Sequence, residues 1–165
     1  MSALVLQFCR FDSLVGRLVD FGTHGTVGHV DIVLPDGSLL GAQHEPGLGR
    51  RPSGVQVRPA NYGDTCGMAG RVWVSLETTD ECALSSMVWA RAQIGAEYDT
   101  RAIEGIALDE DWSTPGKLIC SGLAAGFLTQ PSVPFIGYPL AKNWRIITPE
   151  ELLLICSAFG PVVAL

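Results

Sequence analysis

The sequence predicts an α+β fold, in which an antiparallel sheet packs against helices, from three observations. Residues 28–43, GHVDIVLPDGSLLGAQ, form two apolar runs joined by Pro-Asp-Gly. This is a hairpin signal, because Pro presets the first turn angle and Gly accepts the left-handed angle that closes a bulged loop. Alternating apolar residues at 55–58 and 71–76 predict further strands. Apolar residues at helical spacing over 118–128 predict a helix that buries a face against the sheet.

The composition limits the class of protein. The chain has 165 residues, a common size for one domain, and we expect a single domain over residues 1–165. Hydrophobic residues make up 47% of the chain and charged residues 17%, which is typical of a globular protein with a large core. The 11 basic and 17 acidic residues give a net charge of −6, which disfavours nonspecific binding to nucleic acid.

The amino terminus and the cysteines indicate a cytoplasmic protein. Residues 1–16 lack the basic segment and the cleavage site of a secretory signal. No apolar stretch approaches the roughly 20 residues that a membrane span needs. The five cysteines are odd in number and show neither Cys-x-x-Cys nor zinc-site spacing. We therefore expect free thiols in a reducing cytoplasm, and a site that needs no metal or cofactor.

Local patterns predict the elements in the first half of the chain. Ala3–Cys9 is expected to form a strand, and Ser13–Phe21 a short amphipathic helix. After the hairpin, the segment Glu45–Ser53 is rich in Gly, Pro and Arg and is expected to be a loop. The strands Val55–Arg58 and Arg71–Leu76 follow it. All of these strands are expected in one antiparallel sheet.

Three helices are expected in the second half. The first begins at Thr79 and ends at Gly95, and its apolar set is Leu84, Met87, Val88 and Ile94. A long loop separates it from the second helix, which has Cys120 near its start. The segment Gln130–Lys142 contains three prolines and is expected to be irregular. The sequence Thr148-Pro149-Glu150-Glu151 predicts the start of the last helix.

The position of each cysteine decides which thiol is a candidate nucleophile. A thiol is a useful nucleophile only when a helix N-terminus, a cation or a histidine stabilises its thiolate. Cys156 falls late in an apolar helix and Cys9 ends an apolar strand, so both are expected in the core. Cys66 lies in a Gly-rich loop. Cys82 and Cys120 both fall in the first turn of a helix, so the helix dipole alone leaves Cys82 as the rival of Cys120.

The segment around Cys120 resembles the NlpC-type cysteine peptidase superfamily, a papain-like group of amidases and peptidases often directed at cell-wall peptides. Cys120-Ser121-Gly122-Leu123 is similar to the sequence that opens the central helix of the family, and Ile94-Gly95-Ala96-Glu97-Tyr98-Asp99 is similar to its Gly-x-x-Tyr segment. An ordinary member has its histidine after the cysteine. In this chain His24, His29 and His44 all precede Cys120, an order that fits the circularly permuted members.

The permuted branch includes the YiiX-like hydrolases and the lecithin:retinol acyltransferase group, which open a strand with a pattern like Ser-His-Val-x-Ile. Gly28-His29-Val30-Asp31-Ile32 is similar to that pattern, with glycine in place of serine. The resemblance extends from about Leu4 to the helix that begins at Thr148, and it implies a circularly permuted papain-like fold. It also implies that Cys120 is the nucleophile and that His29 is the base that takes its proton.

A catalytic imidazole usually needs a polar partner that fixes its ring. Permuted relatives often supply this partner from the second hairpin strand, at a position where this sequence has Gly41. A three-residue hairpin loop sets Asp31 opposite Gly41 and His29 opposite Gln43, which favours Gln43 as the third catalytic residue. A two-residue turn would instead bring His44 opposite His29. Asp31, on the same face as His29, is the weaker candidate.

Four further residues have expected roles. Tyr98 resembles the family tyrosine that lines the cleft, where its hydroxyl would bind substrate or stabilise developing negative charge. His44 is the other residue expected to bind substrate. The backbone amide of Cys120, at a helix start, is an expected oxyanion donor. Asp99 is expected to cap the next turn without touching substrate. His24, in a Gly/Thr loop, is expected to be exposed or at the cleft rim.

The predicted function is that of a cysteine peptidase or amidase, which cleaves an amide bond through an acyl-enzyme on Cys120. The expected substrate is a peptide, a glycopeptide or an acyl small molecule. Cell-wall peptide is implied by the resemblance alone, and reaching it without a secretion signal would need a phage-type release route or another export system. The alternatives are an acyltransferase or thioesterase with the same Cys-His pair, and a noncatalytic binding module. Neither the substrate nor the oligomeric state follows from the sequence.

Overall fold

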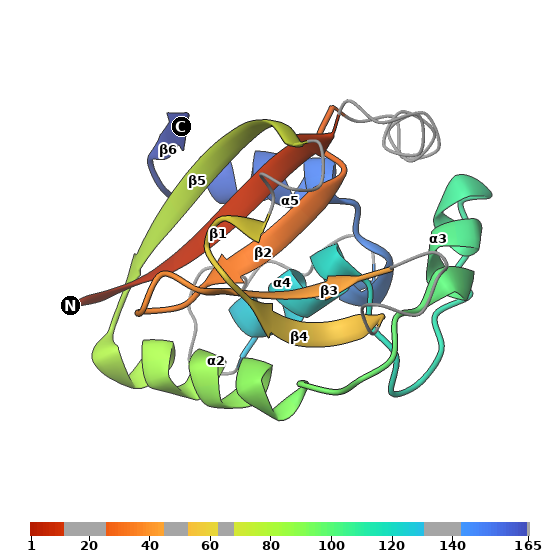
Figure 1. Ribbon diagram of the computed structural model, residues 1–165, viewed down its shortest axis with the longest axis horizontal. Helices are drawn as coiled ribbons and strands as arrows, with labels where there is room; N and C mark the ends of the chain where they lie inside the picture. Colours follow the sequence, from red (N-terminus) through yellow and green to blue (C-terminus); the bar gives the residue numbers. More distant parts are fainter. Residues whose placement is uncertain (12–25, 45–52, 63–67, 131–142, 165) are drawn as a thin grey trace.

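A computed structural model of the chain describes residues 1–11, 26–44, 53–62, 68–130 and 143–164 (Figure 1). Its strands are β1 (Ser2–Phe11), β2 (His29–Val33), β3 (Leu39–Gln43), β4 (Gly54–Arg58), β5 (Met68–Thr78) and β6 (Val162–Ala164). Its helices are α2 (Asp80–Ala92), α3 (Thr100–Ala107), α4 (Cys120–Leu128) and α5 (Pro149–Ser157), with the short 3-10 helix η3 (Trp144–Ile146). The expected helix Ser13–Phe21 lies outside the described residues, as do His24, Cys66, residues 45–52 and residues 131–142.

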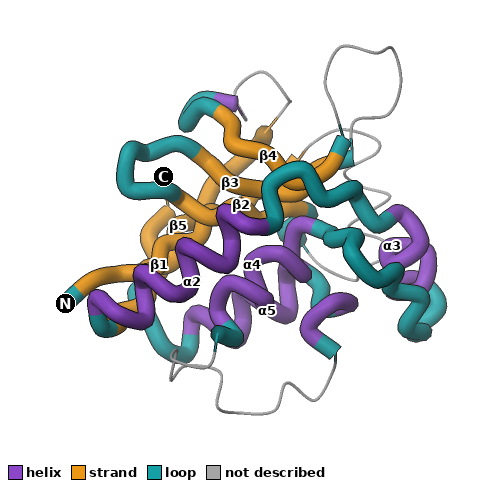
Figure 2. Tube along the Cα trace, turned by 90° about the horizontal axis from the view of Figure 1, so that it is seen from below, coloured by secondary structure: helices purple, strands orange, loops and turns teal. Residues whose placement is uncertain are grey.

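The fold is α+β, as expected. The six strands of the described residues form one antiparallel sheet in the order β4-β3-β2-β1-β5-β6. Figure 2 shows α2, α4 and α5 together on one side of this sheet, with α3 apart at one end. Along the central strands, alternate residues enter the core between sheet and helices. On β1 and β2 these residues are Leu4, Leu6, Phe8, Val30 and Ile32.

The intervening positions of β1 and β2 are polar or titratable, and they are buried as well. Gln7 lies opposite Asp31, and Cys9 lies opposite His29. Each of these four residues is at most 7% exposed. Buried polar side chains are costly unless they have partners, so the contacts of these four residues are considered below.

The hairpin has the expected geometry. The backbone N–H of Leu34 donates to the carbonyl of Ser38 over 2.8 Å, and Val33 lies opposite Leu39. Gly37 has a φ of +82°, the left-handed angle that the bulged loop requires. The carboxylate of Asp36 accepts hydrogen bonds from both the backbone N–H and the hydroxyl of Ser38, which fastens the turn.

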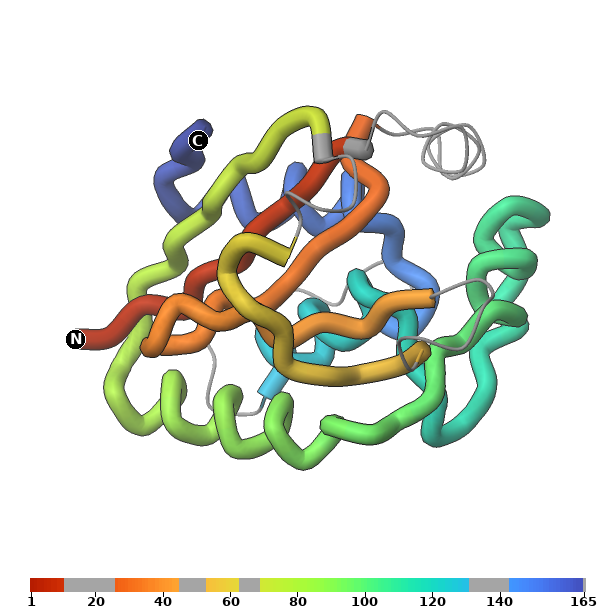
Figure 3. Tube along the Cα trace, in the orientation of Figure 1, coloured from red at the N-terminus to blue at the C-terminus, as the bar shows by residue number. Residues whose placement is uncertain are grey.

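The ladder between β2 and β3 has the expected register but stops early. The two strands pair only at Ile32 with Leu40 and at Val33 with Leu39. Extending this register would place His29 opposite Gln43, but the ladder does not reach them. The two strands therefore separate at the end that carries His29. Figure 3 shows β2 and α4, which are remote in sequence, meeting near this part of the sheet.

Helix α4 is buried on every side, in place of the one-sided stripe that the sequence predicts. All nine of its residues, Cys120–Leu128, are buried. Two glycines make this possible: a Cβ on Gly122 would lie 3.3 Å from the carbonyl oxygen of Arg145, and one on Gly126 would lie 2.2 Å from the indole of Trp89. The hydroxyl of Ser121 donates to the carbonyl of Ile147 over 2.6 Å, which ties α4 to the segment before α5.

Two details of α2 and α3 differ from the expectation. Helix α2 is capped by Thr79 as predicted, but Leu84 and Val88 of its apolar set are more than 60% exposed. Its buried residues are the small side chains of Cys82, Ser86 and Ala90. Helix α3 falls within the segment that was expected to be a loop. Its sequence signal is weak, because the helix has only eight residues after the Asp99 cap and its apolar residues are too few to show a period.

The ends of the last elements also refine the prediction. Helix α5 starts with the expected capping box between Thr148 and Glu151 and ends before Gly160. Strand β6 then pairs with β5, which the sequence does not predict because its three residues are too few for a periodic pattern. None of the described helices combines the length and the apolarity that crossing a bilayer requires.

Replacing Gly126 by alanine tests the packing of α4 against α2. Helix propensity alone would make Gly126→Ala stabilising by about 1 kcal/mol. Because the added Cβ would lie 2.2 Å from the Trp89 ring, we expect the free energy of unfolding to fall instead by about 1–3 kcal/mol. Urea denaturation followed by circular dichroism measures it. Gly70→Ala is the control, since a Cβ at Gly70 meets nothing within 4 Å. A stabilised Gly126→Ala protein would contradict this packing.

Candidate active site

Cys120 is the first residue of α4, and this helix start lacks a side-chain cap. The N-cap residue Ile119 offers no hydrogen bond to the first turn. By contrast, α2, α3 and α5 are capped by Thr79, Asp99 and Thr148. The first N–H groups of α4 are therefore not engaged by a capping side chain, and the positive end of the helix dipole lies beside the Cys120 sulfur.

The structure brings Cys120 to His29. The two side chains form a hydrogen bond, and the backbone N–H of Val30 also donates to the Cys120 sulfur. The N–H of Val30 can donate to the sulfur because the ladder between β2 and β3 ends before Val30. Both hydrogen bonds of Cys120 therefore lie where β2 and β3 separate. Cys120 is 4% exposed and His29 is 7% exposed, so both groups are buried.

Asp31 is the third member of the site, and Cys120, His29 and Asp31 are called the row below. The Nε2 atom of His29 lies 2.9 Å from Oδ1 of Asp31, two residues further along the same strand. Since this contact occupies Nε2, the nitrogen left for the Cys120 sulfur is Nδ1. Asp31 is 3% exposed, and its carboxylate has room because the residue beside it on β3 is Gly41. A Cβ at Gly41 would lie 1.8 Å from Oδ1 of Asp31.

Neither residue that the sequence favours for this role bonds to the imidazole of His29 in the described structure. The Oε1 atom of Gln43 is buried without a hydrogen-bond partner, and His44 is exposed beyond the end of β3. The physical reason is the early end of the ladder, which removes Gln43 from the position opposite His29. The signal for Asp31 is present in the sequence: it shares a strand face with His29, and the cross-strand position beside it is a glycine.

The charges of this row shift the pKa values of both reacting groups. Burial acts to raise the pKa of Cys120, but the positive charge of His29, the hydrogen bond from its ring and the N–H of Val30 together hold that pKa below its ordinary value. Burial acts to lower the pKa of His29, but the negative charges of Asp31 and Cys120 and the hydrogen bonds to both raise it to about 10. Both shifts favour the thiolate and imidazolium form of the pair over the neutral one.

Tyr98 lies close to the nucleophile. Burial, with the negative charges of Cys120 and Asp99, raises the pKa of its hydroxyl well above the ordinary value, so the hydroxyl is a protonated donor at neutral pH. The ring of Tyr98 packs against that of His44, with 5.7 Å between centroids.

Asp99 supports the site without entering it. Its carboxylate accepts hydrogen bonds from the backbone N–H of Ala102, which caps α3, and from the N–H and hydroxyl of Thr114. Its own N–H donates to the carbonyl of Leu118 over 3.2 Å. Asp99 therefore fastens the loop that leads into Cys120, which is the structural role expected for it.

The other described cysteines differ from Cys120 in their surroundings. Cys82 lies in the first turn of α2, where it is one of the buried residues of that helix. Burial raises the pKa of Cys156 to about 12. Burial, reinforced by the charge of Asp31, raises the pKa of Cys9 far above its ordinary value. Of Cys9, Cys120 and Cys156, only Cys120 has its pKa lowered by a histidine.

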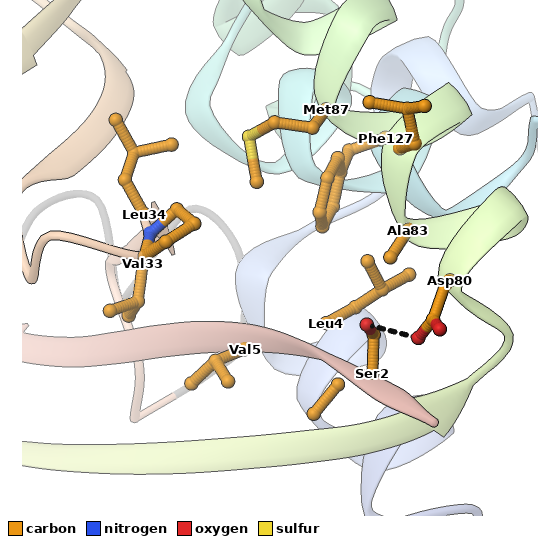
Figure 4. A pocket seen from close by; sticks show the side chains of 12 residues that line it. Ser2, Leu4, Val5, Val33, Leu34, Asp80, Ala83, Met87 and Phe127 are labelled. Atoms are coloured by element: carbon orange, nitrogen blue, oxygen red, sulfur yellow. Dashed lines mark hydrogen bonds between the residues drawn. The ribbon is translucent and has the colours of Figure 1, made fainter.

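A second feature lies at the opposite end of the sheet. A cavity of about 550 Å³ opens between the start of β1, the β2–β3 turn and α2, and Figure 4 shows apolar side chains around it. Leu4, Val33, Met87 and Phe127 line it, and Asp80 lies at its edge with a hydrogen bond from Ser2. The row of Cys120, His29 and Asp31 does not line this cavity.

Comparison with known proteins does not identify the family. No protein-family model matches the chain, and no curated protein sequence matches it either. The chemistry of the site must therefore be argued from its own geometry.

Replacing Gly41 by alanine tests the contact between Asp31 and His29. Because the new Cβ would lie 1.8 Å from Oδ1 of Asp31, the carboxylate must leave its place beside the ring. We expect the pKa of His29 to fall from about 10, since the first cause that raises it is the charge of Asp31. NMR titration of the imidazole measures it.

Two variants serve as references for this titration. Asp31→Asn removes the charge directly and is expected to lower the pKa of His29 as well. Gly70→Ala adds a Cβ in open space and should leave the titration unchanged. An unchanged His29 titration in Gly41→Ala would exclude Asp31 as its partner.

Proposed function

We propose that the protein is a cysteine-dependent hydrolase of the peptidase or amidase type. One observation carries the proposal: a buried cysteine at an uncapped helix start bonds to a histidine that bonds in turn to a carboxylate. A nucleophile, a base and a group that orients the base are the parts that acyl transfer requires. In this proposal the parts are Cys120, His29 and Asp31, with Asp31 in the role that the sequence assigns to Gln43.

The proposed reaction begins with attack of the Cys120 thiolate on the carbonyl carbon of an amide. The carbon–sulfur bond forms as the carbonyl π electrons move to oxygen. The imidazolium of His29 then gives its Nδ1 proton to the leaving nitrogen, the carbon–nitrogen bond breaks, and an acyl-enzyme remains. Neutral His29 next takes a proton from water, whose oxygen attacks the thioester. The acid leaves, and the thiolate and imidazolium are restored.

Developing negative charge on the carbonyl oxygen has two proposed donors. The first is the N–H of Cys120 itself, at the uncapped start of α4, where the helix dipole favours an anion. The second is the hydroxyl of Tyr98, which stays protonated at neutral pH for the reasons given above. Removing a single oxyanion donor costs about 10²–10³ in kcat in enzymes of this chemistry.

The proposed fold is a circularly permuted papain-like one of the NlpC type, in which the strand with the histidine precedes the helix with the nucleophile. The antiparallel sheet and the buried helix α4 are compatible with it. We propose a peptide or glycopeptide as substrate, held at the edge formed by Tyr98 and His44. Cell-wall peptide is the class within this range that the resemblance implies.

Alkylation by iodoacetamide tests the reactive thiolate without a substrate. Cys120 is the one cysteine of the tryptic peptide Leu118 to Lys142, so mass spectrometry follows it separately. Because the pKa of Cys120 is lowered and that of His29 is raised to about 10, alkylation should be fast below the ordinary thiol pKa and level up to about pH 10. Without its imidazolium the thiol is only a few per cent ionised at pH 7, so His29→Asn should slow the reaction by about tenfold or more.

Three outcomes would refute the proposal. They are an unreactive Cys120 in the folded protein, equal rates with and without His29, and a rate that rises only above pH 8.5. Cys82→Ala is the matched control and should change nothing in the Cys120 peptide. An activated ester with and without an added amine then separates hydrolysis from transfer, because transfer would give the amide product.

A further inference from the structure

A buried arginine lies next to Gly41, the glycine that borders Asp31. Arg58 ends β4 and is 4% exposed. Its Nη1 donates to the carbonyl of Gly41 over 3.1 Å, and its guanidinium lies 4.9 Å from the ring centre of Tyr62. Its Nη2 is buried and has no hydrogen-bond partner in the described structure.

Gly41 is where Arg58 meets the row of reacting groups. A Cβ placed on Gly41 would have Oδ1 of Asp31 at 1.8 Å and Nη1 of Arg58 at 3.4 Å. The two opposite charges therefore both lie close to the position that a Cβ of residue 41 would occupy. Both side chains are almost fully buried, so solvent screens their attraction little.

Charge balance gives this arrangement a function. A buried charge is stable only when it is compensated, and removing one partner leaves the other uncompensated. Arg58, Asp31, His29 and Cys120 form a buried series of alternating charge, with the guanidinium at one end and the thiolate at the other. Without Arg58, the carboxylate, the imidazolium and the thiolate would together carry one uncompensated negative charge.

We infer that Arg58 is a positioning residue of the site: its buried guanidinium holds the carboxylate of Asp31 in place beside His29. The inference rests on the proposed function, because it assigns Arg58 a role in holding the Cys-His pair. Arg58 acts through Asp31 and is not placed in contact with the substrate.

Other titratable groups in and around the proposed site also contribute to its electrostatics, and a test of Arg58 must take them into account. They are His29 on β2, Cys120 on α4, Cys9 on β1, Arg71 on β5, Tyr62 after β4 and Tyr98 after α2. Arg71 is the second cation of the group. It lies opposite Cys9 and is only half-buried, so solvent screens its charge more than that of Arg58.

The test follows alkylation of the Cys120 peptide against pH in the full chain. Arg58→Gln removes a buried positive charge, so the Cys120 thiolate should form at higher pH. On the acidic side of the curve of alkylation rate against pH (the acid limb), the midpoint is the pH at which the rate is half its plateau value. We expect this midpoint to rise by about one pH unit or more, which makes alkylation about tenfold slower on that limb. Arg58→Lys keeps the charge and should keep the midpoint. Arg91→Gln removes an exposed charge on α2 and is the matched control.

A second comparison separates action through Asp31 from a general field effect. In an Asp31→Asn background there is no carboxylate to hold, so Arg58→Gln should shift the midpoint by less than half as much. An equal shift in both backgrounds, or no shift with Asp31 present, overturns the inference. If Arg58→Gln does not fold, folded Arg58→Lys decides, and a midpoint moved by a full unit despite the retained charge overturns it.

The two proposals fail in different ways. An unreactive Cys120 in the unaltered protein refutes the proposed function. If Cys120 is reactive but the midpoint of its acid limb is the same with and without Arg58, only the role of Arg58 is refuted. Circular dichroism of each variant confirms that its rate belongs to folded protein.

Discussion

The hydrogen bond between Cys120 and His29 depends on a gap in the sheet. If β2 and β3 paired along their whole length, the N–H of Val30 would be engaged by strand pairing and the start of α4 would have no place beside it. The ladder instead stops at Ile32 and Leu40. The glycines of α4 let the whole helix approach its neighbours, and Asp99 fastens the loop that ends at Cys120. Packing far from the thiol therefore fixes the position of its sulfur.

The burial of the site is compatible with its charges only because they are arranged in opposite pairs. A lone thiol at 4% exposure would resist ionisation, as Cys156 does, whose pKa burial raises to about 12. Beside His29 the opposite holds, because the thiolate and the imidazolium stabilise each other. The same low exposure strengthens each attraction within the row.

The sequence predicts the parts of this protein that local rules determine. The hairpin turn, the caps at Thr79 and Thr148 and the main strands follow from turn chemistry, capping residues and alternation, and the structure has them. Packing determined what was missed. The buried face of α2 uses small residues, so hydrophobicity favoured the wrong side. Helix α3 is too short for a periodic signal. Counting across the hairpin led to Gln43, because no local pattern shows where two strands separate.

Gly41 makes the same point at the level of one residue. Compared with a family pattern that has a polar side chain at this position, a glycine implies a missing catalytic partner. In the structure the absent side chain is a space, and the carboxylate of Asp31 occupies it. A carboxylate two residues from a histidine on one strand can turn toward its ring only if the neighbouring strand leaves room. Asp31 and Gly41 therefore depend on each other, because the glycine leaves the room that the carboxylate needs. Arg58 donates to the carbonyl of that glycine, which places a positive charge near the negative charge of Asp31.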